Sequence, residues 1–155
     1  MLAVGGQTPT LRNPPSGISP VWDLPTIFKH VEAAGISLGA FTGASRYPVA
    51  FYAELQDPAS RAFIHTSSHP ADDEFTRMAT AGTLPDFCFV WSPSGFDEHA
   101  QDQSRDPQYV TKGHDLTWQR VSALVAAGQW QNTVFILTWD DAIVRPMPPR
   151  KPAGL

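Results

Sequence analysis

The feature that most constrains the fold of this chain is an alternation of short, continuous apolar runs with helical patterns between about residues 24 and 141. Continuous apolar runs of this length predict strands that are buried on both faces, as in a parallel sheet covered by helices. The expected strands are 36–41, 87–91 and 133–139. The last of these is the strongest, because it is almost entirely apolar or β-branched. We therefore predict an α/β fold with a mostly parallel sheet flanked by helices.

Glycines and capping residues mark helices between these strands. The expected helices are 25–35, 72–82 and 115–128. Pro25 suits a first helical turn, where no amide donor is needed, and Asp115 can cap the third helix. A glycine stands at the end of each pattern, where helices commonly stop. Residues 48–55 are ambiguous, and a helical turn is favoured there.

The two ends of the chain differ from the middle in composition. The 155 residues include 15 Pro and 11 Gly, which concentrate at the ends. We predict an irregular Pro/Gly-rich segment over 1–22, an α/β domain over 23–141 and a Pro-rich tail over 142–155, with both ends poorly packed. The apolar start, residues 1–4, is too short for a signal peptide, so the cellular location is left open.

Composition argues against several classes of function. The formal net charge is −4, and the 11 Lys and Arg residues form no cluster, so we expect no nucleic-acid partner. No apolar run approaches the roughly 18–20 residues of a membrane span, so we expect no transmembrane segment. Cys88 is the single cysteine, which excludes an internal disulfide and a multi-cysteine zinc site. Its place inside an apolar strand predicts a small core residue.

Polar residues follow each expected strand. Ser45 and Arg46 follow the first strand, Asp97, Glu98 and His99 follow the second after a turn, and Asp140 and Asp141 follow the third directly. Ligands of parallel sheets bind beyond the carboxyl ends of the strands. If the strands are parallel, all three groups lie along that one edge.

The pair Asp140-Asp141 admits two interpretations. Two adjacent carboxylates repel each other unless a cation lies between them or one of them is protonated. Their oxygen atoms suit Mg²⁺, Ca²⁺ or Mn²⁺, and a nearby histidine would extend the choice to zinc or iron. The other interpretation is a turn with two solvated aspartates.

The histidines likewise admit a functional and a structural interpretation. His99 is either a metal ligand or proton donor, or a surface-loop residue. His65 and His69 have a spacing that occurs in some metal sites, but no cysteine or third histidine is close. His114 stands at an expected helix start and is read as structural.

Four segments together resemble a known family. They are residues 26–37, residues 82–85, residues 91–99 with the Asp-Glu-His sequence, and residues 130–141 with the Thr-Trp-Asp-Asp sequence. In order, spacing and placement at strand ends, they resemble the phosphoesterase family that includes bacterial phospholipases C and acid phosphatases, which belongs to the alkaline phosphatase-like superfold. The resemblance covers about residues 20–141.

The resemblance carries expectations for the site. The family's Thr-Trp-Asp-Asp motif supplies two aspartates to a divalent metal centre, which implies that Asp140 and Asp141 are metal ligands. Its Asp-x-His motif implies that His99 is an active-site residue. The implied cofactor is a divalent metal ion of open identity, and the implied substrate is a small phosphoester or a phospholipid. Relatives are often exported.

The sequence also departs from the family pattern. Family members carry an upstream acidic-plus-Asn metal pair and a Ser or Thr nucleophile, and no residue here can be assigned to those roles. After the aspartates, residues 142–145 replace the family's Gly-Gly turn and Asp-His. We therefore expect a partial chain with little or no activity alone, and with exposed sheet edges that favour self-association. Three hypotheses remain: a phosphoester hydrolase, an inactive fragment of one, or a module that binds an anion or a metal.

Overall fold

The computed structural model describes residues 22–98 and 106–139. The strands are β1 (Leu38–Gly43), β2 (Ile64–Ser67) and β3 (Phe87–Val90). The α-helices are α2 (Ile27–Ala33), α3 (Pro58–Arg61), α4 (Glu74–Ala81) and α5 (Tyr109–Ala126). Short 3-10 turns cover Val49–Phe51, Ala53–Leu55, Pro70–Asp72 and Trp130–Asn132. The two turns within 48–55 agree with the helical turn favoured there.

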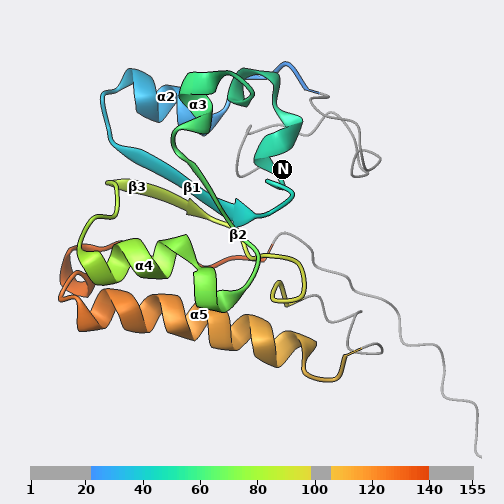
Figure 1. Ribbon diagram of the computed structural model, residues 1–155. Coiled ribbons are helices and arrows are strands. Elements are labelled where there is room, and N and C mark those ends of the chain that lie inside the picture. Colours follow the sequence, from blue (N-terminus) through green and yellow to red (C-terminus); the bar gives the residue numbers. More distant parts are fainter. Residues whose placement is uncertain (1–21, 99–105, 140–155) are drawn as a thin grey trace, which may run out of the picture.

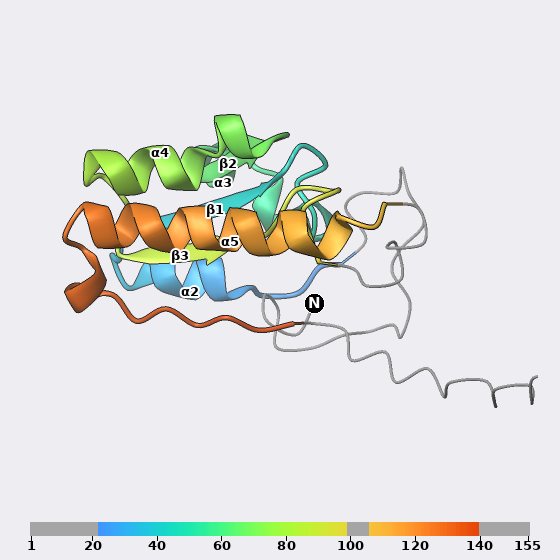
Figure 2. The same ribbon diagram turned by 90° about the horizontal axis from the view of Figure 1, so that it is seen from below.

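The three strands form one parallel sheet in the order β2-β1-β3. Helices α2 and α3 cover one face of it, and α4 and α5 cover the other (Figure 1). Figure 2 shows α5 running along the sheet beside α4. The predicted α/β fold, a parallel sheet flanked by helices, is confirmed.

The central strand β1 divides the core in two, because successive side chains of a strand point to opposite faces. Ala40 belongs to a cluster on the α2 side, with Trp22, Phe28, Val49, Tyr52 and Leu55. Phe41 belongs to a cluster on the α4/α5 side, with Phe75, Ala79 and Leu124. Cys88 is partly buried against this second cluster, and burial raises the pKa of its thiol to about 12. Cys88 is therefore the packed residue that the sequence predicts.

Local signals explain where the helices begin and end. The Asp73 side chain accepts a hydrogen bond from the amide of Thr76 and caps α4, and Gly82 ends that helix with a left-handed φ of 69°. Both features agree with the expected helix over 72–82. Helix α5 begins at Tyr109, six residues before the expected start at Asp115. No helix among the described residues is long and apolar enough to cross a membrane.

The expected strand 133–139 is wrong as a member of the sheet. The segment has no assigned strand, and it follows the 3-10 turn Trp130–Asn132. Phe135 packs against the core cluster on the α4/α5 side, with its ring 6.0 Å from that of Trp130. Among the described residues, no backbone hydrogen bond joins this segment to β3, so it does not extend the three-stranded sheet. Figure 2 shows it as an orange-red coil that runs along one side of the molecule, past β3 and α2 and away from α4.

The sequence did not predict β2. Ile64–Ser67 has four residues, of which three are polar, so it lacks the apolar run that marks the other strands. It is ordered by its parallel pairing with β1, which aligns Ala40 with Ile64 and Gly43 with Ser67.

Candidate functional site

The carboxyl edge of the sheet gathers polar residues from all three strands. Because β1, β2 and β3 are parallel, the segments that follow them leave the sheet at the same edge. Ser45 and Arg46 come after β1, and Asp97 and Glu98 come after β3. These two groups follow parallel strands of one sheet, as expected, but the third group, Asp140 and Asp141, was expected after a strand over 133–139 that is not assigned, and it lies outside the described residues.

The loop after β3 packs closely onto this edge. A Cβ atom added at Gly43 would lie 3.1 Å from Cα of Pro93, so the glycine at the end of β1 allows the loop to approach. The ring of Phe96 lies 5.4 Å from that of His69, which follows β2. The loop after β3 thus contacts the end of β1 and the segment that follows β2.

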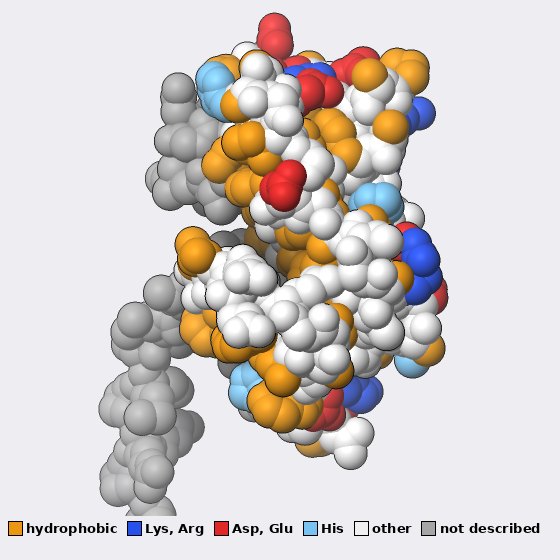
Figure 3. All heavy atoms as spheres, turned by 90° about the vertical axis from the view of Figure 1, so that its left-hand side faces the viewer, with side chains coloured by type: hydrophobic (Ala, Val, Ile, Leu, Met, Phe, Trp, Pro, Cys, Tyr) orange, Lys and Arg blue, Asp and Glu red, His pale blue; other side chains and the backbone are white. Residues whose placement is uncertain are grey.

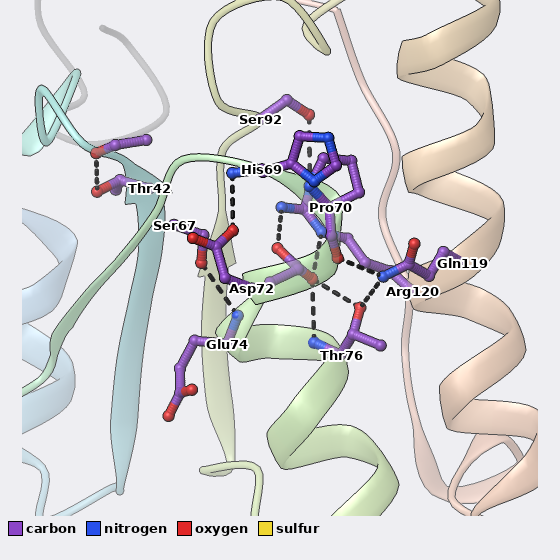
Figure 4. A network of polar contacts seen from close by, with 12 residues as sticks. Thr42, Ser67, His69, Pro70, Asp72, Glu74, Thr76, Ser92, Gln119 and Arg120 are labelled. Carbon is purple, nitrogen blue, oxygen red and sulfur yellow. Dashed lines mark hydrogen bonds and ion pairs between the residues drawn. The ribbon is translucent and has the colours of Figure 1, made fainter.

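A buried ion pair links α4 to α5 beside this edge (Figure 4). Arg120 donates from Nη2 to Oδ1 of Asp73 at 2.7 Å and from Nε to Oδ2 at 3.1 Å. The two side chains are only 6% and 2% exposed. Nη1 of Arg120 lies 3.5 Å from Oγ of Ser92, in the loop after β3. The guanidinium therefore joins both helices to the carboxyl edge.

The protonation of Asp73 follows from its contacts. Burial raises the pKa of the Asp73 carboxyl, but the hydrogen bonds and charge of Arg120 and the hydrogen bonds from Thr76 together outweigh it. The net result is a pKa below the usual value, so the pair is ionised at neutral pH. This buried, doubly hydrogen-bonded ion pair therefore has a structural role: it joins α4 to α5.

Glu98 is a second carboxylate at this edge whose position is fixed by several polar contacts. Its side chain is 11% exposed, and Oε2 accepts a hydrogen bond from Nε1 of Trp139 at 3.0 Å. Nε2 of His114 lies 3.2 Å from the same oxygen, and Thr117 Oγ1 donates to Oε1 at 3.4 Å. The backbone of Glu98 has a left-handed φ of 62°. Gly113 of α5 lies directly against this residue.

The predicted site residues His99, Asp140 and Asp141 lie outside the described residues. Their described neighbours are Glu98, which precedes His99, and Trp139, which precedes Asp140. The hydrogen bond between these neighbours joins two parts of the chain that are 41 residues apart in sequence. Sequence reasoning singled out Glu98 only as part of a polar group and did not predict this contact.

The other histidines have structural surroundings. His65 lies in β2 and stacks on Phe41, with ring centroids 4.9 Å apart. Nδ1 of His69 accepts a hydrogen bond from the amide of Ala71 at 3.1 Å. His114 contacts Glu98. Within residues 22–98 and 106–139, the structure contains no group of three or more His, Cys, Asp or Glu residues that could hold a metal ion.

Sequence reasoning also missed Arg120. The signal was its spacing, because Leu116, Arg120 and Leu124 are four residues apart and share the buried face of α5. An arginine within an apolar helical stripe indicates a buried acidic partner, and Asp73 is that partner.

A comparison with known families decides which family this chain represents. The sequence profile of the Phosphoesterase family matches residues 4–144. The chain belongs to the phosphoesterase family. None of the curated proteins matches it. The matched range includes His99, Asp140 and Asp141 and confirms the resemblance to the family. At the level of the family, the chemistry is hydrolysis of phosphoesters.

Proposed function

We propose that this chain carries the metal-binding and leaving-group parts of a phosphoester hydrolase site, at the carboxyl edge of its sheet. In this proposal Asp140 and Asp141 hold one divalent cation, and His99 donates a proton to the departing oxygen. The proposal rests on family membership over residues 4–144. The metal, the roles of the individual residues and an enzyme of the phospholipase C or acid phosphatase type are parts of this proposal.

The observation that carries the proposal is the hydrogen bond between Trp139 and Glu98. One of these residues precedes Asp140, and the other precedes His99. The contact joins the side chains of the two described residues that are next to His99 and Asp140 in sequence. This arrangement supports a shared site for His99 and the aspartate pair.

The chemistry of the donors also fits. Two carboxylates offer the oxygen ligands that Mg²⁺, Mn²⁺ and Ca²⁺ prefer. A divalent ion bound there would polarise phosphoryl oxygens. Histidine is a residue type that commonly acts as a general acid, so His99 is suited to give a proton to the leaving oxygen. Among the described residues, the same edge also contains the Glu98 carboxylate, which is hydrogen-bonded to Trp139, and the ion pair between Arg120 and Asp73.

The proposal is tested by the binding of inorganic phosphate to the purified chain, with and without Mn²⁺. We expect Mn²⁺ to tighten phosphate binding at least about tenfold, which is about 1.4 kcal/mol. The Asp140→Asn/Asp141→Asn variant should lose this gain. Phosphate binding that ignores Mn²⁺ would favour the alternative of an anion-binding module, and binding of neither ligand would favour an inactive fragment.

A parallel assay with a chromogenic monoester and a chromogenic diester addresses catalysis. We expect hydrolysis close to background with Mg²⁺, Mn²⁺, Ca²⁺ or Zn²⁺, because no Ser or Thr here can be assigned as the nucleophile. Metal-dependent turnover that the double variant abolishes would overturn this expectation, and it would identify which phosphoester class the site accepts.

A further inference from the structure

The carboxylate of Glu98 is contacted by two other parts of the chain. Its side chain is 11% exposed. From α5, Nε2 of His114 lies 3.2 Å from Oε2, and Oγ1 of Thr117 donates to Oε1 at 3.4 Å. From a segment 41 positions away in sequence, Nε1 of Trp139 donates to Oε2 at 3.0 Å. A carboxylate that is largely removed from water needs such donors, and here they join α5 to Trp139 through one side chain.

The backbone of Glu98 adopts a conformation that glutamate does not favour. Its φ of 62° lies in the left-handed region, where a residue with a long side chain costs about 1–2 kcal/mol. Such a conformation persists where the surroundings determine it. Gly113 of α5 lies directly against Glu98, since it has no Cβ atom to block the approach. The contacts of the Glu98 side chain therefore offset an unfavourable backbone.

Trp139 is held by its polar contact more than by burial. Its side chain is 61% exposed, and Ile136 in the same segment is 82% exposed. Four residues before Trp139, Phe135 packs against the core cluster on the α4/α5 side. Among the described residues, the end of segment 133–139 is thus anchored by the ring of Phe135 and by the hydrogen bond from Trp139 to Glu98.

These contacts lie at the carboxyl edge of the sheet. Glu98 belongs to the loop after β3, and His114 and Thr117 belong to the first half of α5. The opposite edge, which faces the viewer in Figure 3, is different, because hydrophobic side chains gather there between the two helix layers. Glu98 and its partners therefore lie on the side of the sheet where ligands of parallel sheets bind.

We propose that Glu98 is a positioning residue for the metal site formed by Asp140 and Asp141. It does not bind the ion, but it fixes Trp139 against α5 and so restricts the backbone that continues into the two aspartates. Residues that orient metal ligands typically contribute about 10–100-fold to affinity, because ligands held in place need less ordering when the ion binds. This inference rests on the proposed function, since the aspartate pair is the site that Glu98 positions.

Mn²⁺ affinity in four variants tests the role of Glu98, with free Mn²⁺ followed by electron paramagnetic resonance. Glu98→Ala and Trp139→Phe should each weaken binding about tenfold, because each removes one partner of the hydrogen bond. The double variant should bind no more weakly than either, since both changes act through one contact. Glu98→Gln keeps an oxygen acceptor for Nε1 without the charge, so its affinity should stay within about threefold of the wild type.

Trp118→Phe is the matched control, because Trp118 is an exposed residue of α5 and its replacement should leave Mn²⁺ affinity unchanged. Circular dichroism establishes that each variant is folded. If Glu98→Ala does not fold, Trp139→Phe tests the same contact from its exposed partner.

The indole N–H of Trp139 provides a second measurement that needs no metal. Its signal in a ¹H–¹⁵N spectrum is assigned by its loss in Trp139→Phe. We expect its exchange with water to become about tenfold faster in Glu98→Ala, which corresponds to the loss of one hydrogen bond of ordinary strength. The indole N–H of Trp118 should not change.

The outcomes separate this inference from the function on which it rests. A wild-type chain that binds no Mn²⁺ would overturn both. Binding that Asp140→Asn/Asp141→Asn abolishes and Glu98→Ala leaves unchanged would keep the metal site and overturn the role of Glu98. Equal losses in Glu98→Gln and Glu98→Ala would show that charge acts instead of position. Unchanged exchange of the Trp139 indole in Glu98→Ala would show that Glu98 does not hold Trp139, and either result would also overturn the inference.

Discussion

Arg120 is buried inside the domain, where the buried carboxylate of Asp73 balances its charge. Its guanidinium satisfies both carboxylate oxygens of Asp73, which the amide and hydroxyl of Thr76 also contact. The role of Asp73 as a helix cap could be predicted, because an acidic run precedes an apolar helical pattern. Its partner could not be predicted in the same way, since the two residues are 47 positions apart and only the packing of α4 on α5 brings them together.

We expect Arg120→Met to destabilise the fold strongly. Methionine keeps much of the side-chain volume, but it leaves the Asp73 carboxylate buried without its counter-charge, which costs about 3–5 kcal/mol in comparable pairs. The measurement is the free energy of unfolding in urea at neutral pH. Arg77→Met is the matched control, because Arg77 is 66% exposed and pairs with Glu74 at the surface of α4. Equal losses in the two variants would show that burial of the Arg120–Asp73 pair has no special weight.

At the scale of elements, the helices were easier to predict than the strands. The expected helices over 25–35 and 72–82 correspond to α2 and α4, because glycine and capping signals act locally. Strand β2 was missed, since its polar sequence is ordered by pairing with β1. Segment 133–139 has every local property of a strand, yet no strand is assigned to it and it does not join the three-stranded sheet. Pairing partners are a property of the whole fold, and short segments do not encode them.

Gly113, the fifth residue of α5, provides a test of the close contact between this helix and Glu98 in the loop after β3. Gly113→Ala adds a methyl group that would overlap Cγ of Glu98 and lie 3.0 Å from its backbone nitrogen. Alanine favours a helix by about 1 kcal/mol over glycine, but we expect the overlap to win, with a net loss of about 1–3 kcal/mol in thermal or urea unfolding.

Thr111→Ala, at an exposed position of the same helix, is the control for helix propensity. It should raise stability slightly, by about 0.5 kcal/mol. If Gly113→Ala were as stabilising as the control, the close contact between α5 and Glu98 would be wrong.

At the scale of the molecule, topology explains how distant parts of the sequence reach one edge. Parallel strands with helical crossovers bring the segments after β1, β2 and β3 to the same side, which the alternating pattern of the sequence predicted. The roles proposed for His99, Asp140 and Asp141 came from the family resemblance, because an aspartate pair or a single histidine is equally typical of a solvated loop. The contact between Glu98 and Trp139 required the folded chain, since no local pattern specifies it.

The central claim is that Asp140 and Asp141 form a divalent metal site, and calorimetric titration of the purified chain with Mn²⁺ tests it most directly. Two carboxylates alone should bind weakly, with a Kd of about 0.1–1 mM. We predict that Asp140→Asn/Asp141→Asn weakens binding at least about tenfold. Asp23→Asn/Asp115→Asn, which removes the same charge from two exposed positions, should leave it unchanged. Absence of Mn²⁺ binding in the wild-type chain, or equal affinity in the two double variants, would contradict the claim.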